Sequence, residues 1–139
     1  MYKKILLAVD GSENSMRATE EAVKIVSLIP DCKIEVVYVA DFSKSKKEIL
    51  HSQGKEDLEI SRRKKLSPIE EIIKSKNVAY EIKILHGEPG PTIIEYANNE
   101  NGDLVVIGSR GLNSLQEMVL GSVSHKVVKR VDCPVLIVK

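Results

Sequence analysis

The feature that most constrains the fold is the alternation of short apolar runs with longer segments of helical periodicity. Residues 5–9 and 104–107 are uninterrupted apolar runs of strand length, which is typical of strands buried on both faces of a sheet. Residues 13–28 instead repeat apolar side chains every three or four positions, the pattern of a helix with one buried face. This alternation predicts an α/β fold with an open parallel sheet and helices on both of its faces.

The predicted elements follow one another as strand and helix along the whole chain. Strands are expected at residues 5–9, 33–40, 79–85, 104–107 and 134–138, and helices at 13–28, 56–76, 91–99 and 122–130. The helical stretch 56–76 contains Pro68 after a Ser cap, so it is either one kinked helix or two consecutive helices. Residues 79–85 alternate apolar and charged side chains, which predicts an edge strand exposed on one face. The polar stretch 41–55 is expected to be a flexible loop.

Composition limits the classes of protein to be considered. The chain of 139 residues suits a single domain, residues 1–139, with a substantial core. A net charge of +1 gives no indication of a nucleic-acid-binding face, and no apolar run approaches the ~20 residues of a membrane span. The apolar stretch after Met1 is too short for a signal peptide, so we expect a cytoplasmic protein. Cys32 and Cys133 lack metal-site or redox spacing and are expected to be buried thiols.

A glycine-rich segment (residues 108–122) follows the fourth predicted strand and is the main candidate for a binding site. It reads Gly108-Ser109-Arg110-Gly111, then nine residues, then Gly121-Ser122-Val123-Ser124. Glycines let backbone N–H groups approach a phosphate, and the following helix presents free N–H groups and the positive end of its dipole. The alternative is a glycine-rich turn with an ordinary Ser cap. Two Gly-Ser pairs at the two ends favour a phosphate or nucleotide site, although the segment matches neither a P-loop nor a dinucleotide fingerprint.

The position of this segment in the predicted sheet supports the same interpretation. Ligands of open α/β sheets bind beyond the carboxyl ends of the strands, where the strand order reverses. The candidates for that point are Asp10-Gly11-Ser12, after the first strand, and Gly108-Ser109, after the fourth. We find no Ser-His-Asp arrangement, metal cluster or obvious general base near the segment, and therefore predict no catalytic residue.

Three motifs together resemble the universal stress protein family. They are the spacing Gly-x-x-Gly-x9-Gly-Ser over residues 108–122, the opening residues 2–12 and the closing residues 132–138. The resemblance covers essentially the whole chain and implies a Rossmann-like, adenine nucleotide alpha hydrolase-like fold with strand order 3-2-1-4-5. Because every glycine of the motif and its final serine are present, the chain is similar to the branch of the family that binds ATP.

The resemblance also implies which residues contact the nucleotide. The expected binding residues are Ala8, Val9, Asp10, Val39, Gly108, Ser109, Arg110, Gly111, Leu112, Asn113, Ser114, Gly121, Ser122, Val123 and Ser124. Val39 would meet adenine through its backbone, and Ser122 to Ser124 would close on phosphate oxygens. Asp10 would face the ribose or a phosphate-bound Mg²⁺ or Mn²⁺, with no metal held by the protein alone. The Arg110 side chain either neutralises phosphate charge or points to solvent.

By this resemblance the chain would be a stress-response regulator that binds ATP, ADP or AMP with little or no hydrolysis. The alternatives are a slow or partner-dependent ATPase or nucleotidyl-transfer enzyme, and an interaction protein with a vestigial pocket. A homodimer through the last strand, Pro134-Val135-Leu136-Ile137-Val138, is also implied, besides an unidentified protein partner. Valine at Gly108 or Gly121 is expected to abolish binding while the fold survives, since a branched side chain would occupy the space of the phosphates.

Overall fold

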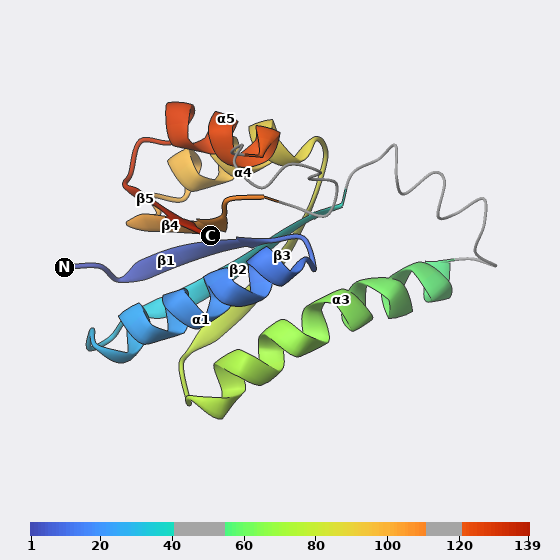
Figure 1. The fold of residues 1–139 in the computed structure, drawn as a ribbon, viewed down its shortest axis with the longest axis horizontal. Coiled ribbons are helices and arrows are strands. Elements are labelled where there is room, and N and C mark those ends of the chain that lie inside the picture. Colours follow the sequence, from blue (N-terminus) through green and yellow to red (C-terminus); the bar gives the residue numbers. More distant parts are fainter. Residues whose placement is uncertain (41–54, 111–120) are drawn as a thin grey trace.

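A five-stranded parallel sheet forms the centre of the computed structural model, which describes residues 1–40, 55–110 and 121–139, without the side chains of 55–59 (Figure 1). The strand order is β3-β2-β1-β4-β5, as the resemblance to the universal stress protein family implied. The strands are β1 (Lys4–Val9), β2 (Lys33–Ala40), β3 (Tyr80–His86), β4 (Leu104–Gly108) and β5 (Val135–Val138). The expected edge position of β3 is confirmed, and β5 forms the opposite edge.

Helices cover both faces of the sheet, which confirms the predicted three-layer arrangement. Helices α1 (Glu13–Ser27) and α3 (Lys55–Ser75) lie on one face, and α4 (Pro89–Asn99) and α5 (Ser122–Arg130) lie on the other (Figure 1). The central strand β1 supplies side chains to both layers, because Ile5 and Leu7 join the core under α1 and α3 while Leu6 and Ala8 face α4 and α5. This double burial explains why residues 5–9 form an uninterrupted apolar run.

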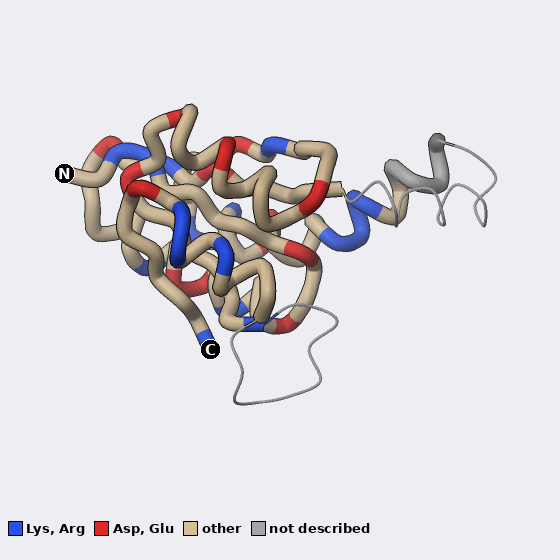
Figure 2. Tube along the Cα trace, turned by 90° about the horizontal axis from the view of Figure 1, so that it is seen from above, with Lys and Arg blue, Asp and Glu red and all other residues tan. Residues whose placement is uncertain are grey.

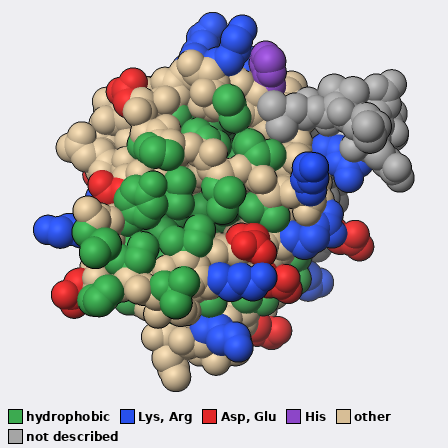
Figure 3. All heavy atoms as spheres, turned by 60° about the vertical axis from the view of Figure 1, so that its left-hand side comes forward, with side chains coloured by type: hydrophobic (Ala, Val, Ile, Leu, Met, Phe, Trp, Pro, Cys, Tyr) green, Lys and Arg blue, Asp and Glu red, His purple; other side chains and the backbone are tan. Residues whose placement is uncertain are grey.

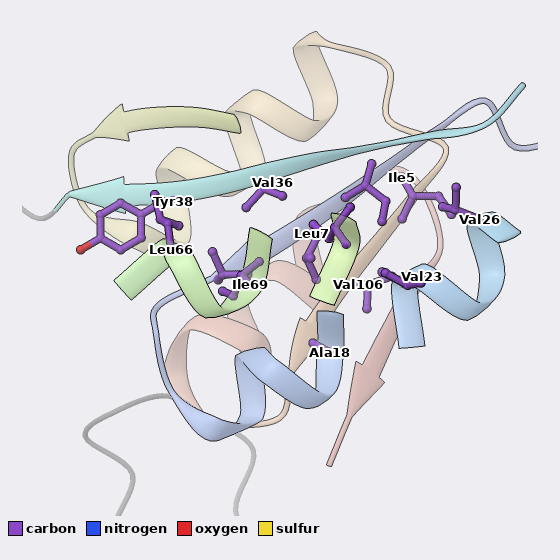
Figure 4. Packing of buried hydrophobic residues seen from close by; sticks show 14 of the residues in the cluster. Ile5, Leu7, Ala18, Val23, Val26, Val36, Tyr38, Leu66, Ile69 and Val106 are labelled. Carbon is purple, nitrogen blue, oxygen red and sulfur yellow. The ribbon is translucent and has the colours of Figure 1, made fainter. Parts of the chain in front are cut away.

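The larger core lies between the sheet and helices α1 and α3 (Figure 4). Ala18 and Val23 of α1 and Ile69 of α3 point toward the strands there, with Val36 and Val106 from the sheet (Figure 4). Helix α3 runs through Pro68 as one helix, so of the two alternatives left by the sequence the single helix is found. Cys32 is buried at the amino end of β2, as predicted, whereas Cys133 is only half-buried; both are free thiols.

One charged side chain lies inside the smaller core under α4. Glu35 on β2 is 3% exposed. The hydroxyl of Tyr96 on α4 donates to Glu35 Oε1 over 3.3 Å, and Lys4 Nζ lies 3.7 Å from Glu35 Oε2. Burial and the neighbouring Glu35 carboxylate raise the pKa of Tyr96 to about 12. The buried carboxylate therefore ties β1, β2 and α4 together at the amino ends of the strands.

Lys and Arg residues alternate with Asp and Glu residues along the trace of the described residues (Figure 2). Within the same residues, no helix combines the length and apolar character needed to cross a membrane. Hydrophobic side chains gather on the face that includes the exposed edge of β5 (Figure 3), where Val135, Leu136, Ile137 and Val138 are all half-buried. The expected loop at 41–55 lies outside the described residues except for Lys55, which begins α3.

Candidate functional site

The candidate site lies at the carboxyl ends of β1 and β4, the two central strands. These strands are neighbours, with Ala8 opposite Ile107 in the ladder. The chain leaves β1 into α1 on one face of the sheet and leaves β4 toward α5 on the other (Figure 1). The strand order thus reverses between β1 and β4, and the predicted residues Asp10 and Ser109 emerge at this reversal point.

A network of short hydrogen bonds fixes the turn after β1. Asp10 Oδ1 accepts from the backbone N–H of Ser12 over 2.9 Å and from the hydroxyl of Ser15 over 2.7 Å. Ser15 Oγ in turn accepts the backbone N–H of Asp10, and Ser12 caps α1 by accepting the N–H of Ser15. Gly11 has φ of +86°, a left-handed conformation that side chains disfavour. The carboxylate of Asp10 is therefore held in one orientation by its own turn.

The last residue of β4 packs directly on the first turns of α1. A Cβ atom added to Gly108 would lie 2.8 Å from Asn14 Cβ and 3.1 Å from the Asn14 backbone carbon. The sequence-based expectation that Gly108→Val leaves the fold intact is therefore corrected. Gly108 is glycine because helix α1 approaches the end of β4 at this point, whatever a ligand would require.

The two described ends of the glycine segment are fastened together. The Ser124 hydroxyl donates to the Gly108 carbonyl over 2.6 Å, and the Gly121 N–H donates to the Ser109 carbonyl over 2.7 Å. Gly121 is the N-cap residue of α5. The first-turn amides of α5, which lack partners within the helix, therefore begin beside the carboxyl end of β4. Ser124 is 3% exposed, and its hydroxyl is used within the protein to join the two ends of the segment. Ser122 is exposed.

The structure adds three residues that sequence reasoning did not assign to the site. Ser15 orients Asp10, and the side-chain amide of Asn14 donates to the Arg110 carbonyl over 3.0 Å. The aliphatic stem of Lys65 on α3 lies against Gly11, where an added Cβ would be 3.3 Å from Lys65 Cβ. The Asp-x-Ser-x-x-Ser spacing from Asp10 was a usable signal for Ser15. The positions of Asn14 and Lys65 depend on tertiary packing and left no such signal.

The remaining predicted residues are placed as follows. Ala8 and Val9 are buried at the carboxyl end of β1, one facing each core, and Val39 is half-buried near the end of β2. Arg110 is half-buried, and Val123 packs against the smaller core. Gly111, Leu112, Asn113 and Ser114 lie outside the described residues. The structure thus brings together, at the carboxyl ends of the central strands, Asp10, Gly108, Ser109, Gly121 and Ser124.

The donor groups at the carboxyl ends of β1 and β4 suit an anion better than a metal ion held by the protein alone. The start of α5 supplies backbone N–H groups and the Ser122 hydroxyl, which are anion-binding groups. Among the described residues, no three His, Cys, Asp or Glu side chains come together as metal ligands. Asp10 supplies a single carboxylate. A divalent cation here would take most of its ligands from phosphate and water, as Mg²⁺ commonly does.

Comparison with known proteins agrees with this architecture. The chain is similar over residues 1–139 to the model of the universal stress protein family. It is 34% identical over 155 residues to universal stress protein YxiE of Bacillus subtilis, with all of both chains covered. The solved structure of MJ0577 of Methanocaldococcus jannaschii superposes with a TM-score of 0.83 at 29% identity, covering 100% of this chain and 96% of that one.

A plant relative carries a ligand. A universal stress protein family protein from Arabidopsis thaliana, solved with AMP bound, superposes with a TM-score of 0.69 at 25% identity and covers 99% of this chain and 91% of its own. The family match spans the whole chain, and the matches to YxiE and MJ0577 cover nearly all of both partners. The chain therefore belongs to the universal stress protein family.

Proposed function

We propose that this chain binds ATP, or its relatives ADP and AMP, at the carboxyl ends of β1 and β4 and acts as a regulator. The observation that carries the proposal is the start of α5, which the Gly121–Ser109 and Ser124–Gly108 hydrogen bonds hold beside the end of β4. An anion placed there meets free N–H groups and the positive end of the helix dipole. The AMP bound by the Arabidopsis relative supports an adenine nucleotide as the ligand.

In this proposal each part of the site has one task. The first-turn amides of α5 and the Ser122 hydroxyl bind the phosphates, together with the backbone of the glycine segment. Asp10, which its turn holds rigidly, meets the ribose or a phosphate-bound Mg²⁺ or Mn²⁺. The backbone of Val39, near the end of β2, meets adenine. The protein would respond to the presence of bound ATP. We propose that it hydrolyses ATP little or not at all.

The decisive measurement is calorimetric titration of protein freed of carried-over nucleotide. We expect ATP or AMP to bind with a dissociation constant below millimolar, and GTP to bind more weakly. Gly121→Val should weaken binding of ATP while the far-UV circular dichroism stays that of the wild type. Wild-type protein that binds no adenine nucleotide at millimolar concentration would refute the proposal. If the protein alone hydrolysed ATP steadily, and Asp10→Ala abolished that activity, the chain would be an enzyme and not a regulator.

We also propose that the chain pairs with a second copy through β5. This strand is an edge of the sheet, is apolar, and lies in the hydrophobic face of Figure 3. An exposed apolar edge favours pairing with another strand, because its outer backbone groups would otherwise be satisfied only by water. Sedimentation equilibrium should therefore give twice the mass of the 15.4 kDa chain.

A further inference from the structure

A continuous path of hydrogen bonds joins the end of the chain to the start of the glycine segment. Arg17 on α1 donates through Nε to the Lys139 carbonyl over 2.9 Å and through Nη2 to the Asn14 side-chain carbonyl. The amide nitrogen of Asn14 then donates to the carbonyl of Arg110 over 3.0 Å. A second link runs directly between the two strands, since the N–H of Ser109 donates to the Val138 carbonyl over 2.7 Å.

Asn14 is the central residue of this path. Its side-chain carbonyl accepts a hydrogen bond from Arg17, and its side-chain NH₂ donates one to the Arg110 carbonyl, so both polar groups of the side chain are hydrogen-bonded. The residue is 6% exposed and touches Gly108, which limits its freedom to turn. Movement of the Arg110 backbone therefore either carries Asn14 with it or leaves a buried amide without its acceptor, which costs free energy.

We infer that Asn14 and Arg17 are positioning residues that hold the backbone at Ser109 and Arg110 in its binding position and couple it to the end of β5. The inference rests on the proposed nucleotide site, because it concerns the same backbone. In the structure the Arg110 carbonyl is bonded to Asn14, and the inference requires a second backbone arrangement in which this bond is broken. A nucleotide that binds only the bonded arrangement stabilises the whole path as far as Lys139, and by linkage an ordered β5 end favours the nucleotide.

Two substitutions that preserve net charge test the path without changing attraction for phosphate. Asn14→Leu has a similar shape but neither donor nor acceptor, and Arg17→Lys keeps the charge but has no fork to reach two acceptors. We expect Asn14→Leu to raise the dissociation constant of ATP about tenfold, the equivalent of one hydrogen bond. Arg17 is exposed, so Arg17→Lys should have a smaller effect in the same direction. Arg63→Lys on the exposed face of α3 is the matched control and should bind as the wild type does.

Hydrogen exchange provides a readout that a merely structural role would not change. Addition of ATP to the wild type should slow exchange in the peptide covering residues 135–139, and this protection should be lost in Asn14→Leu even at saturating ATP. Unchanged affinity in Asn14→Leu, or equal protection of β5 in the variant and the wild type, would overturn the inference alone. Failure of the wild type to bind any nucleotide would overturn the proposed function and the inference together.

Discussion

Gly108 shows how one residue can serve the fold at a site that was predicted for binding. Because an added Cβ would lie 2.8 Å from Asn14 Cβ, Gly108→Ala should lower the free energy of unfolding by about 1–3 kcal/mol, as for other overpacked sites. Gly90→Ala is the matched control. The three atoms nearest to a Cβ added there all belong to the Lys126 side chain, the closest being Cδ at 3.0 Å, and alanine favours helix α4. Urea unfolding of both variants measures the difference, and equal stabilities would contradict the close packing of α1 on β4.

The buried Glu35 pair predicts a dependence of stability on alkaline pH. The pKa of Tyr96 is raised to about 12 from 10.0, first by burial and then by Glu35, so the folded state holds the phenol proton more tightly than the unfolded state. Stability from this group is complete below pH 10 and is lost as the pH rises from about 10 to about 12. Tyr96→Phe should therefore flatten the fall in unfolding free energy between these pH values.

The same variant should lose about 1–2 kcal/mol of unfolding free energy at pH 8, because Glu35 Oε1 loses a donor inside the core. Urea unfolding at pH 8 and at pH 11 compares the two effects. Tyr2→Phe, which leaves the Glu35 pair intact, is the control and should keep the slope of the wild type. A Tyr96→Phe protein whose stability falls as steeply as that of the wild type would show that another group titrates.

The residues of the candidate site divide by the kind of signal they left in the sequence. Asp10 and Gly121 were predictable because they stand at the ends of an apolar strand and of a helix, positions that local patterns identify. Asn14 was not, since its role depends on how closely α1 approaches β4. The position of Lys65 was not predictable either, because nothing in its own segment shows that Gly11 will lie against it.

At the scale of single elements, α3 is the clearest case in which local signals left two answers open. Ser67, Pro68 and Glu70 have the features of a helix start, but the structure continues one helix through them. Burial decides the outcome, because Leu66, Ile69 and Ile73 on both sides of the proline pack in the same core. The strands were predictable from periodicity, and Lys33–Ala40 was found with the expected bounds. Helix α4 starts at Pro89, two residues before the predicted start at Pro91. Both positions are prolines, and sterics permit a proline in the first turn of a helix, so the sequence did not distinguish them.

Pro68 should therefore destabilise the helix that contains it. Proline has no N–H to donate to the carbonyl of Lys64 and costs up to about 3 kcal/mol in a helix interior, partly offset by a less flexible unfolded chain. Pro68→Ala is expected to raise the free energy of unfolding by about 1–2 kcal/mol. Ser67→Ala, at an exposed neighbouring position, controls for helix propensity alone. A loss of stability in Pro68→Ala would mean that the proline ring, half-buried here, supports packing that alanine cannot replace.

At the scale of the whole molecule, the sheet has two edges of different character. The edge strand β3 carries Glu81 and Lys83, and charged side chains discourage pairing with another strand. The described edge strand β5 carries no charge between Val135 and Val138. The carbonyls of Pro134 and Val138 accept hydrogen bonds from β4 and the residue after it, so the even-numbered residues of this segment direct their backbone groups toward β4. The backbone N–H and carbonyl of Ile137 therefore face away from the sheet. We therefore expect a second copy to pair with β5 and not with β3.

Lysine placed on each edge should separate these predictions. Ile137→Lys puts a charge on the apolar edge, where its stem can lie along the half-buried surface while its ammonium reaches water, and we expect the dimer to dissociate. Ile84→Lys, at a position on β3 that is 42% exposed, should leave the dimer intact. Sedimentation equilibrium measures both masses, and circular dichroism verifies that both variants fold. If Ile84→Lys alone yields monomers, the copies pair through β3; if neither does, association uses a helical face, and the apolar side chains around β5 need another explanation.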